Sequence, residues 1–155
     1  MALEKMVSRE EKAAAWFSSR GWTPFPFQRE AWHSFLAGKS GLVNAPTGSG
    51  KTYSLAVPIL LEGLGSKVTK VQALWITPIR ALSKEIENAV KSAAEGLDSS
   101  WKVGVRTGDT KVSEKVKQKE KPPAILITTP ESLHQLLSQK GYVDYFSELQ
   151  SVVVD

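Results

Sequence analysis

The chain has 155 residues, of which 41% are hydrophobic and 23% charged. That suits a soluble unit of one domain or slightly less, with enough apolar residues for a core. The absence of cysteine excludes disulfides and cysteine metal sites, and two histidines argue against a zinc site. No apolar run reaches the roughly 18 residues of a membrane span, and the charged start lacks a signal-peptide pattern, so we expect a cytoplasmic protein. The net charge of +4 permits a polyanionic partner without identifying one.

Hydrophobic periodicity, interrupted by glycine and proline, predicts alternating helices and strands. Helices are expected over residues 8–20, 27–36, 53–61, 81–95, 112–119, 132–139 and 142–149. Buried strands are expected over residues 40–44, 71–77, 102–107, 124–129 and 151–154. Ser8, with Glu11 three residues later, forms a capping-box pattern that predicts the start of the first helix. The alternation predicts an α/β fold: an open, doubly wound, mostly parallel sheet with helices on both faces.

A glycine-rich turn, APTGSGKT at residues 45–52, joins the first predicted strand to the helix at 53–61. Its glycines let backbone N–H groups curve around an oxyanion, and the helix dipole adds partial positive charge there. Lys51 supplies a full charge for the terminal phosphates, and the Thr52 hydroxyl is placed to ligate Mg²⁺. The pattern G-x-x-x-x-G-K-[ST] is met except that Ala45 replaces the first glycine. An ordinary surface turn is the alternative, but we predict an ATP site formed by Thr47, Gly48, Ser49, Gly50, Lys51 and Thr52.

Gln28 lies near the start of the second predicted helix. Its amide offers a donor and an acceptor together, which match the N6/N7 edge of adenine. Taken alone, a glutamine is more often an exposed surface residue. Four aromatic residues nearby could stack on a base: Trp16, Phe17, Trp22 and Phe25. However, tryptophans in so small a chain, which has five, are more often core residues.

Polar clusters follow every predicted strand. In parallel sheets the carboxyl ends of the strands share one edge, beyond which ligands bind. We therefore expect a single functional edge formed by Thr47-Gly48, Thr77-Pro78-Ile79-Arg80, Thr107-Gly108-Asp109, Thr129-Pro130-Glu131 and Asp155. The basic stretch at residues 111–121 is interpreted as a solvated helix in preference to a dedicated nucleic-acid tract.

These motifs resemble the first RecA-like motor domain of superfamily 2 helicases. Within that group the chain is similar to the Lhr-type DEXH-box enzymes, particularly the bacterial ligase-associated DEXH-box helicases. The resemblance covers nearly the whole chain in the correct order and rests on Pro26-Phe27-Gln28 with Ala31-Trp32, and on residues 44–52, 77–82, 106–110, 127–133 and 152–155. Ala45 is ordinary in such helicases.

The resemblance implies a role for each matching position. Gln28 would recognise adenine, and residues 48–52 would be motif I, which holds the phosphates and Mg²⁺. Asp155 would be the first acid of motif II, associated with Mg²⁺, so Lys51 and Asp155 are the implied catalytic residues. Motifs Ia and Ib and the turn between them would follow the backbone of a bound strand through Thr77, Pro78, Arg80, Gly108, Asp109, Thr129, Pro130 and Glu131. Residues 1–39 would carry the adenine motif, and residues 40–155 the ATP-binding core.

The implied function is that of an ATP-dependent DNA helicase or translocase, with 3′–5′ polarity and a role in DNA repair. Its implied partners are single-stranded or tailed duplex DNA and, by analogy, a DNA ligase and a nuclease. In the family, motif II continues with a glutamate that orients water, and a second RecA-like domain supplies an arginine finger. Residues 1–155 contain neither, so we expect them to bind nucleotide with negligible hydrolysis. We also expect the open sheet edge to promote self-association.

Three alternatives stay open. The chain could be a nucleotide- or DNA-binding fragment without catalysis, part of an RNA helicase, or a P-loop kinase. A kinase would need an arginine-rich lid and an acceptor pocket, for which the sequence offers no candidate. Contacts to the strand backbone barely distinguish DNA from RNA, so the residues leave that choice open.

Overall fold

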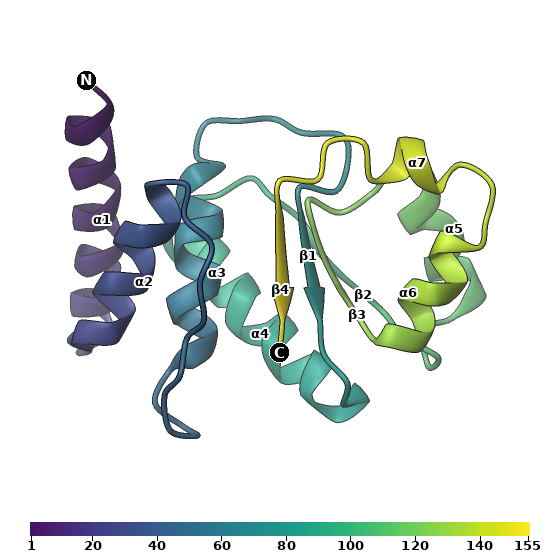
Figure 1. Cartoon of the computed structure of the whole chain (residues 1–155), viewed down its shortest axis with the longest axis horizontal. Coiled ribbons are helices and arrows are strands. Elements are labelled where there is room, and N and C mark those ends of the chain that lie inside the picture. Colours follow the sequence, from purple (N-terminus) through teal and green to yellow (C-terminus); the bar gives the residue numbers. More distant parts are fainter. The chain divides into compact units, whose positions relative to one another are not determined.

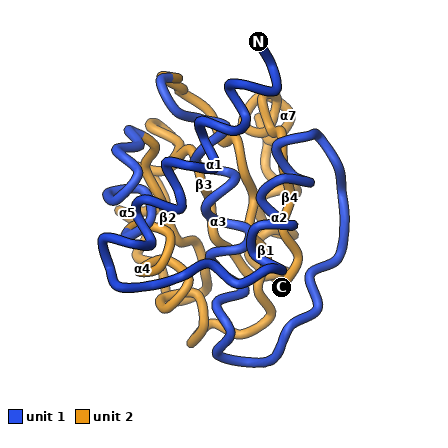
Figure 2. The backbone as a smooth tube through the Cα atoms, turned by 90° about the vertical axis from the view of Figure 1, so that its left-hand side faces the viewer, with its two compact units in different colours: residues 1–65, 92–100 blue, residues 66–91, 101–155 orange.

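A computed structural model describes residues 1–155, which form two compact units. The first comprises residues 1–65 and 92–100, and the second comprises residues 66–91 and 101–155 (Figure 2). The division assigns the glycine-rich turn to the same unit as the N-terminal helices. None of the helices combines the length and the apolar character needed to cross a membrane.

The first unit contains the helices α1 (Ala2–Ser19), α2 (Pro26–Leu36) and α3 (Lys51–Glu62). Their aromatic side chains pack edge to face in one cluster, in which Phe17 contacts Trp32 with ring centroids 5.2 Å apart. The Trp32 indole also donates a hydrogen bond of 3.0 Å to the Tyr53 carbonyl, which fixes α2 against α3. Trp16, Phe17 and Trp32 are buried, so these rings form the core and do not serve as a base-stacking surface.

Two predictions for this unit are wrong. The strand expected over residues 40–44 is absent: the backbone there has no strand partner, and Leu42 is 93% exposed. A short apolar run forms a strand only where a neighbouring strand completes its hydrogen bonds, which periodicity cannot show. The first helix begins at Ala2, so Ser8 lies inside it and caps nothing. The residues before Ser8 are good helix formers, and their propensity outweighs the capping-box pattern.

The second unit is built on a parallel sheet of four strands, as predicted: β1 (Ala73–Ile76), β2 (Val103–Arg106), β3 (Ile125–Thr128) and β4 (Ser151–Val154). The strand order is β2-β3-β1-β4, and every neighbouring pair is parallel. Leu74 pairs in register with Leu126 on β3 and with Val152 on β4. The edges of the sheet are therefore β2 and β4.

Helices cover both faces of this sheet. They are α4 (Arg80–Gly96, its last residues belonging to the first unit), α5 (Val112–Glu120), α6 (Pro130–Leu137) and α7 (Tyr142–Tyr145). Figure 1 shows α4 on one side of the sheet and α5, α6 and α7 on the other. On the α6 side, Leu74 and Leu126 pack with Leu136 in a buried cluster. Arg106 is in register with Thr128, two residues beyond Leu126, so its side chain points to that same face.

Candidate nucleotide and nucleic-acid sites

The glycine-rich turn of the first unit leads directly into α3. Gly50 is the N-cap residue of the helix with φ +82°, and Gly48 has φ +78°. Both angles lie in the left-handed region that glycine adopts without strain, which explains the residue type at each position. Ser49 closes the turn, because its backbone N–H and its hydroxyl both donate to the Pro46 carbonyl.

The polar side chains of Lys51 and Thr52, at the start of α3, form no ion pair or side-chain hydrogen bond within the protein. Lys51 is exposed and forms no ion pair. Thr52 is half-buried, and its hydroxyl has no hydrogen-bond partner within the protein. No acidic residue occupies the first turn of α3. A helix N-terminus, an ammonium group and a hydroxyl are thus available together, which fits the chemistry of a triphosphate with its Mg²⁺.

Gln28 joins the start of α2 to this turn. Its side chain is only 3% exposed; Oε1 accepts the Phe25 N–H at 2.8 Å, and Nε2 donates to the Gly50 carbonyl at 3.0 Å. Each end of the amide keeps one further hydrogen-bonding position. Phe25 beside it is 54% exposed and stacks on Phe27 with ring centroids 6.0 Å apart. The structure therefore places Gln28 against the phosphate turn, and its contact with adenine stays a prediction.

In the second unit the polar clusters after β1, β2, β3 and β4 lie at one edge of the sheet, because all four strands run parallel. Two backbone hydrogen bonds hold this edge: the Thr77 N–H donates to the Thr128 carbonyl, and the Asp155 N–H to the Ile76 carbonyl, both at 2.9 Å. The Asp155 carboxylate is exposed and forms no ion pair. Thr47-Gly48 belongs to the other unit, and its place on this edge stays a prediction.

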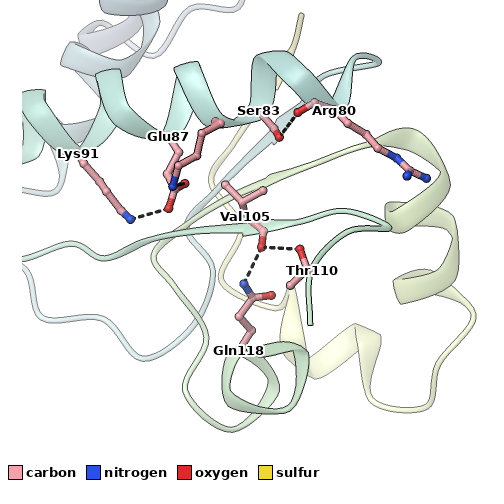
Figure 3. Close-up of polar contacts among 8 residues, drawn as sticks. Arg80, Ser83, Glu87, Lys91, Val105, Thr110 and Gln118 are labelled. Atoms are coloured by element: carbon pink, nitrogen blue, oxygen red, sulfur yellow. Dashed lines mark hydrogen bonds and ion pairs between the residues drawn. The ribbon is translucent and has the colours of Figure 1, made fainter. Parts of the chain in front are cut away.

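Arg80 is the most prominent exposed cation of the edge. It lies at the start of α4, and Figure 3 shows its side chain extending from the end of that helix. Its Nη1 pairs with the Asp109 carboxylate at 3.2 Å, although both side chains are more than half exposed. The guanidinium lies against Gly108, where an added Cβ would be 2.5 Å from Nη2. Exposed pairs of this kind contribute little stability.

Thr77 and Thr129 are buried, with exposures of 0% and 1%. The Thr129 hydroxyl accepts the Ser132 N–H at 3.4 Å and caps α6. The Thr77 hydroxyl is buried without a partner. Neither hydroxyl faces solvent in this structure, so their contact with a strand stays a prediction. The other predicted members of the edge are exposed: Pro78, Arg80, Gly108, Asp109, Pro130 and Glu131.

Glu87 on α4 was not singled out by sequence reasoning. It is 9% exposed and accepts hydrogen bonds from Lys84 at 2.9 Å and from Lys91 at 2.5 Å. Burial acts to raise the pKa of the Glu87 carboxyl, but the two lysine contacts outweigh it, and the pKa lies below its ordinary value. The spacing of Glu87 from Lys84 and Lys91, i,i+3 and i,i+4, predicts these ion pairs from sequence. The burial of Glu87 cannot be predicted from that spacing. Figure 3 shows Glu87 with Lys91 on the side of α4 that faces β2.

Gln118 anchors the otherwise polar helix α5. Its Nε2 donates to the Val105 carbonyl at 2.9 Å, and the Thr110 hydroxyl donates to the same oxygen at 3.2 Å (Figure 3). Gln118 is 4% exposed, while most of α5 is solvated as predicted. A buried glutamine therefore fixes a helix that periodicity alone leaves without a packing face.

Comparisons with known proteins identify relatives of the whole arrangement. The DEAD/DEAH box helicase family profile matches residues 25–155. The chain is 32% identical to the "Lhr helicase/ probable uracil glycosylase" of Mycolicibacterium smegmatis, covering 90% of this chain and 10% of that protein. It is 34% identical to the "ATP-dependent helicase Lhr-Core" of Methanocaldococcus jannaschii, covering 94% of this chain and 19% of that protein.

Among solved structures, the helicase Lhr of Mycobacterium smegmatis bound to ssDNA and AMP-PNP superposes with a TM-score of 0.78 at 31% identity. The match covers 91% of this chain and 19% of that one. The present chain thus spans between a tenth and a fifth of the length of these relatives.

Proposed function

Because the chain belongs to the DEAD/DEAH box helicase family, we propose that it is the ATP-binding part of an Lhr-type, ATP-dependent DNA helicase or translocase. The relatives named above supply the Lhr-type assignment, and the ssDNA in the solved relative supports DNA as the polymer. Since the chain spans a small part of those relatives, the activity is proposed for the complete polypeptide.

The observation that carries the ATP proposal is the unengaged start of α3. The side chains of Lys51 and Thr52 form no ion pair or hydrogen bond within the protein, and two left-handed glycines shape the turn before them. Lys51 would neutralise the terminal phosphates, and the backbone N–H groups of the turn would bind their oxygens. Gln28 would hold the turn through Gly50 and present its remaining amide positions to adenine.

Thr52 of the first unit and Asp155 of the second are each proposed, from the resemblance of their motifs, as a ligand of Mg²⁺. Both offer oxygen ligands, which this ion prefers, and neither side chain is engaged with another residue. When bound, the ion would neutralise the charge of the phosphates. Lys51 and Asp155 are accordingly the proposed catalytic residues of this chain.

The edge of the second unit is the proposed path of the DNA strand. Arg80 is the exposed cation there, and the start of α6 offers exposed Pro130 and Glu131 next to the capped N-terminus. Thr77 and Thr129 would act after a local rearrangement or by holding the backbone of the edge in shape. Contacts of this kind bind phosphates and carry no base sequence information.

The proposal also includes four more specific properties, which rest on the resemblance of this chain's motifs to those of the helicase family. They are a 3′–5′ direction, a role in DNA repair, a cytoplasmic location, and partnership with a DNA ligase and a nuclease. RNA as the natural polymer is the main alternative, because the edge would contact only the strand backbone.

The test is ATP hydrolysis by the complete polypeptide with no nucleic acid, with single-stranded DNA, and with RNA of the same sequence. We expect DNA to stimulate hydrolysis and Lys51→Ala to abolish it, whereas Lys39→Ala, an exposed lysine of the same unit, serves as the matched control. Hydrolysis that is equal with and without nucleic acid would contradict the motor proposal. Stimulation by RNA alone would replace DNA with RNA.

A further inference from the structure

A cavity of about 370 Å³ lies among α5, α6 and α7. Its lining includes Lys70, Arg106, Lys119, Lys140, Tyr142 and Tyr145. Lys70 precedes β1, Lys119 lies in the last turn of α5, and Tyr142 begins α7 ahead of β4. In Figure 1, α7 lies by the amino ends of the strands, whereas Arg106 is the last residue of β2, directly before the Thr107-Gly108-Asp109 cluster. The motif assignments above give this cavity no role.

Arg106 is the unusual residue of the cavity. Its side chain is 7% exposed and forms no ion pair. Its Nη1 donates a long hydrogen bond of 3.4 Å to the Lys115 carbonyl. Burial lowers the pKa of the guanidinium, with Tyr145 acting in the opposite direction. Buried arginines are normally paired with an acid because an unpaired buried charge is costly. Arg106 therefore has a charge with no acid beside it and further N–H donors with no protein acceptor, and these nitrogens are not fully enclosed.

Tyr145 adds a second unsatisfied group beside it. The Tyr145 hydroxyl is buried and has no hydrogen-bond partner. Burial raises the pKa of this hydroxyl, which the charge of Arg106 partly offsets, so it is protonated at neutral pH and can donate a hydrogen bond. The neutral hydroxyl and the remaining N–H groups of the guanidinium are hydrogen-bond donors without an acceptor. An anion in the cavity would supply acceptor oxygens.

The remaining charges agree with an anion in the cavity. Lys70 is already neutralised by Asp144 at 2.7 Å, whereas Lys119 and Lys140 form no ion pair. Glu120 is the other acid of the lining. Apolar atoms complete the walls, contributed by Pro122 and Leu136 together with the Tyr142 ring.

We propose that this cavity binds an organic phosphate. The phosphate would lie against Arg106 with Lys119 and Lys140 beside it, and the organic part would lie against Leu136 and the Tyr142 ring. The volume is in the range of small-ligand pockets, larger than one phosphate ion requires. Arginine is the side chain best suited to hold a phosphate through two parallel N–H bonds. A free mononucleotide and the phosphorylated end of a nucleic-acid strand share this chemistry.

A purely structural role for Arg106 makes the opposite prediction about stability. If the bond to the Lys115 carbonyl were its purpose, Arg106→Met would destabilise the ligand-free protein and alter no ligand response. If the site is built for an anion, the buried charge is a cost when the cavity is empty. Arg106→Met is then neutral or stabilising without ligand, as for other uncompensated buried charges.

The experiment measures binding of phenyl phosphate by the Lys51→Ala chain, so that the phosphate turn of the first unit does not contribute. Titrations at constant ionic strength are followed by the tyrosine ring signals in NMR and by the thermal midpoint. We expect saturable binding that Arg106→Met weakens at least about tenfold, as expected for loss of a charged hydrogen bond. Lys140→Ala, an exposed position that cannot unfold the chain, is expected to weaken binding less. Lys117→Ala, on the exposed side of α5, is the matched control and leaves binding unchanged.

Thymidine 5′-monophosphate and oligothymidylates with and without a 5′-phosphate distinguish the two sources of the phosphate. Tighter binding of the monophosphate points to a free nucleotide, and preference for the 5′-phosphorylated oligomer points to a strand end. Absence of saturable binding to every one of these probes, or equal binding by Arg106→Met, would overturn the proposal. Because Lys51 is already replaced, that failure would leave the ATP proposal intact.

Discussion

Gln28 uses both ends of its amide to join segments of the first unit that lie 22 residues apart. Replacing it with alanine leaves the Phe25 N–H without its acceptor and the Gly50 carbonyl with only the Ser54 N–H, both in part-buried surroundings. Each unsatisfied group costs about 1–3 kcal/mol. We expect Gln28→Ala to lower the free energy of unfolding by at least about 1 kcal/mol and to weaken ATP binding, measured by urea denaturation and calorimetry. Gln135→Ala, an exposed glutamine on α6, should change neither quantity, and an unaltered Gln28→Ala protein would show that the link is unimportant.

The carboxyl of Glu87 makes stability depend on pH in a defined direction. Because its folded-state pKa lies below the ordinary value of 4.5, its stabilising contribution is present above that pH and is lost as the pH falls through the folded-state pKa. Acid unfolding of the wild type should therefore be steeper below about pH 4.5 than that of Glu87→Gln. Glu85→Gln, at an exposed position of the same helix, should retain the wild-type slope. Identical pH profiles for the wild type and Glu87→Gln would contradict this assignment.

Residue types in motifs were predictable from sequence, whereas their burial was not. Lys51 and Gln28 follow from local patterns because the chemistry of a phosphate turn needs those side chains at that spacing. Arg106 lies in the matched stretch 106–110, but that pattern does not show its burial away from acids, which depends on three helices brought together by folding. For the same reason, the burial of Thr77 and Thr129 could not be foreseen from their place after a strand.

At the scale of elements, the start of α4 and the loop after β2 meet where the Arg80 side chain lies against Gly108 and Asp109. A Cβ on Gly108 would lie 2.5 Å from the Arg80 guanidinium, the far end of a flexible side chain that can move aside. Gly108→Ala should therefore change the free energy of unfolding by less than about 0.5 kcal/mol, as at other surface positions. It should weaken salt-dependent binding of single-stranded DNA, measured by fluorescence anisotropy, because Arg80 loses its position. Gly41→Ala, where a Cβ meets nothing within 4 Å, is the control, and equal DNA affinity for both variants would refute the role of Arg80.

The strands of the second unit were the most predictable elements. Three are short apolar runs and the fourth, residues 103–106, alternates, and the parallel pairing follows from the long connections between them. Residues 40–44 carry a similar run and yet form no strand. What separates the cases is a neighbour for the backbone hydrogen bonds: β1 has one on each side, and residues 40–44 have none. That difference belongs to tertiary structure and is absent from local pattern.

At the scale of the whole molecule, the outer edge of β4 is an apolar strand edge without a strand partner. No strand pairs with its free side, and Val152 and Val154 are 53% and 77% exposed. Exposed apolar edge strands template pairing with another chain, and a charged side chain blocks it. We expect concentration-dependent self-association in analytical ultracentrifugation that Val154→Lys reduces. Val143→Lys, at an exposed valine on α7, should leave it unchanged, and equal effects of the two lysines would point to general solubility instead of the edge.

The central claim is that residues 47–52 hold a triphosphate at the start of α3. Its most direct test is calorimetric titration of the 155-residue chain with ATP and Mg²⁺, compared with Lys51→Ala and with Lys39→Ala. We predict saturable binding by the wild type and Lys39→Ala and a loss of at least about tenfold in affinity for Lys51→Ala, because a charged contact to phosphate is removed. A folded wild-type chain that binds no ATP, or a Lys51→Ala variant that binds it equally well, would contradict the account.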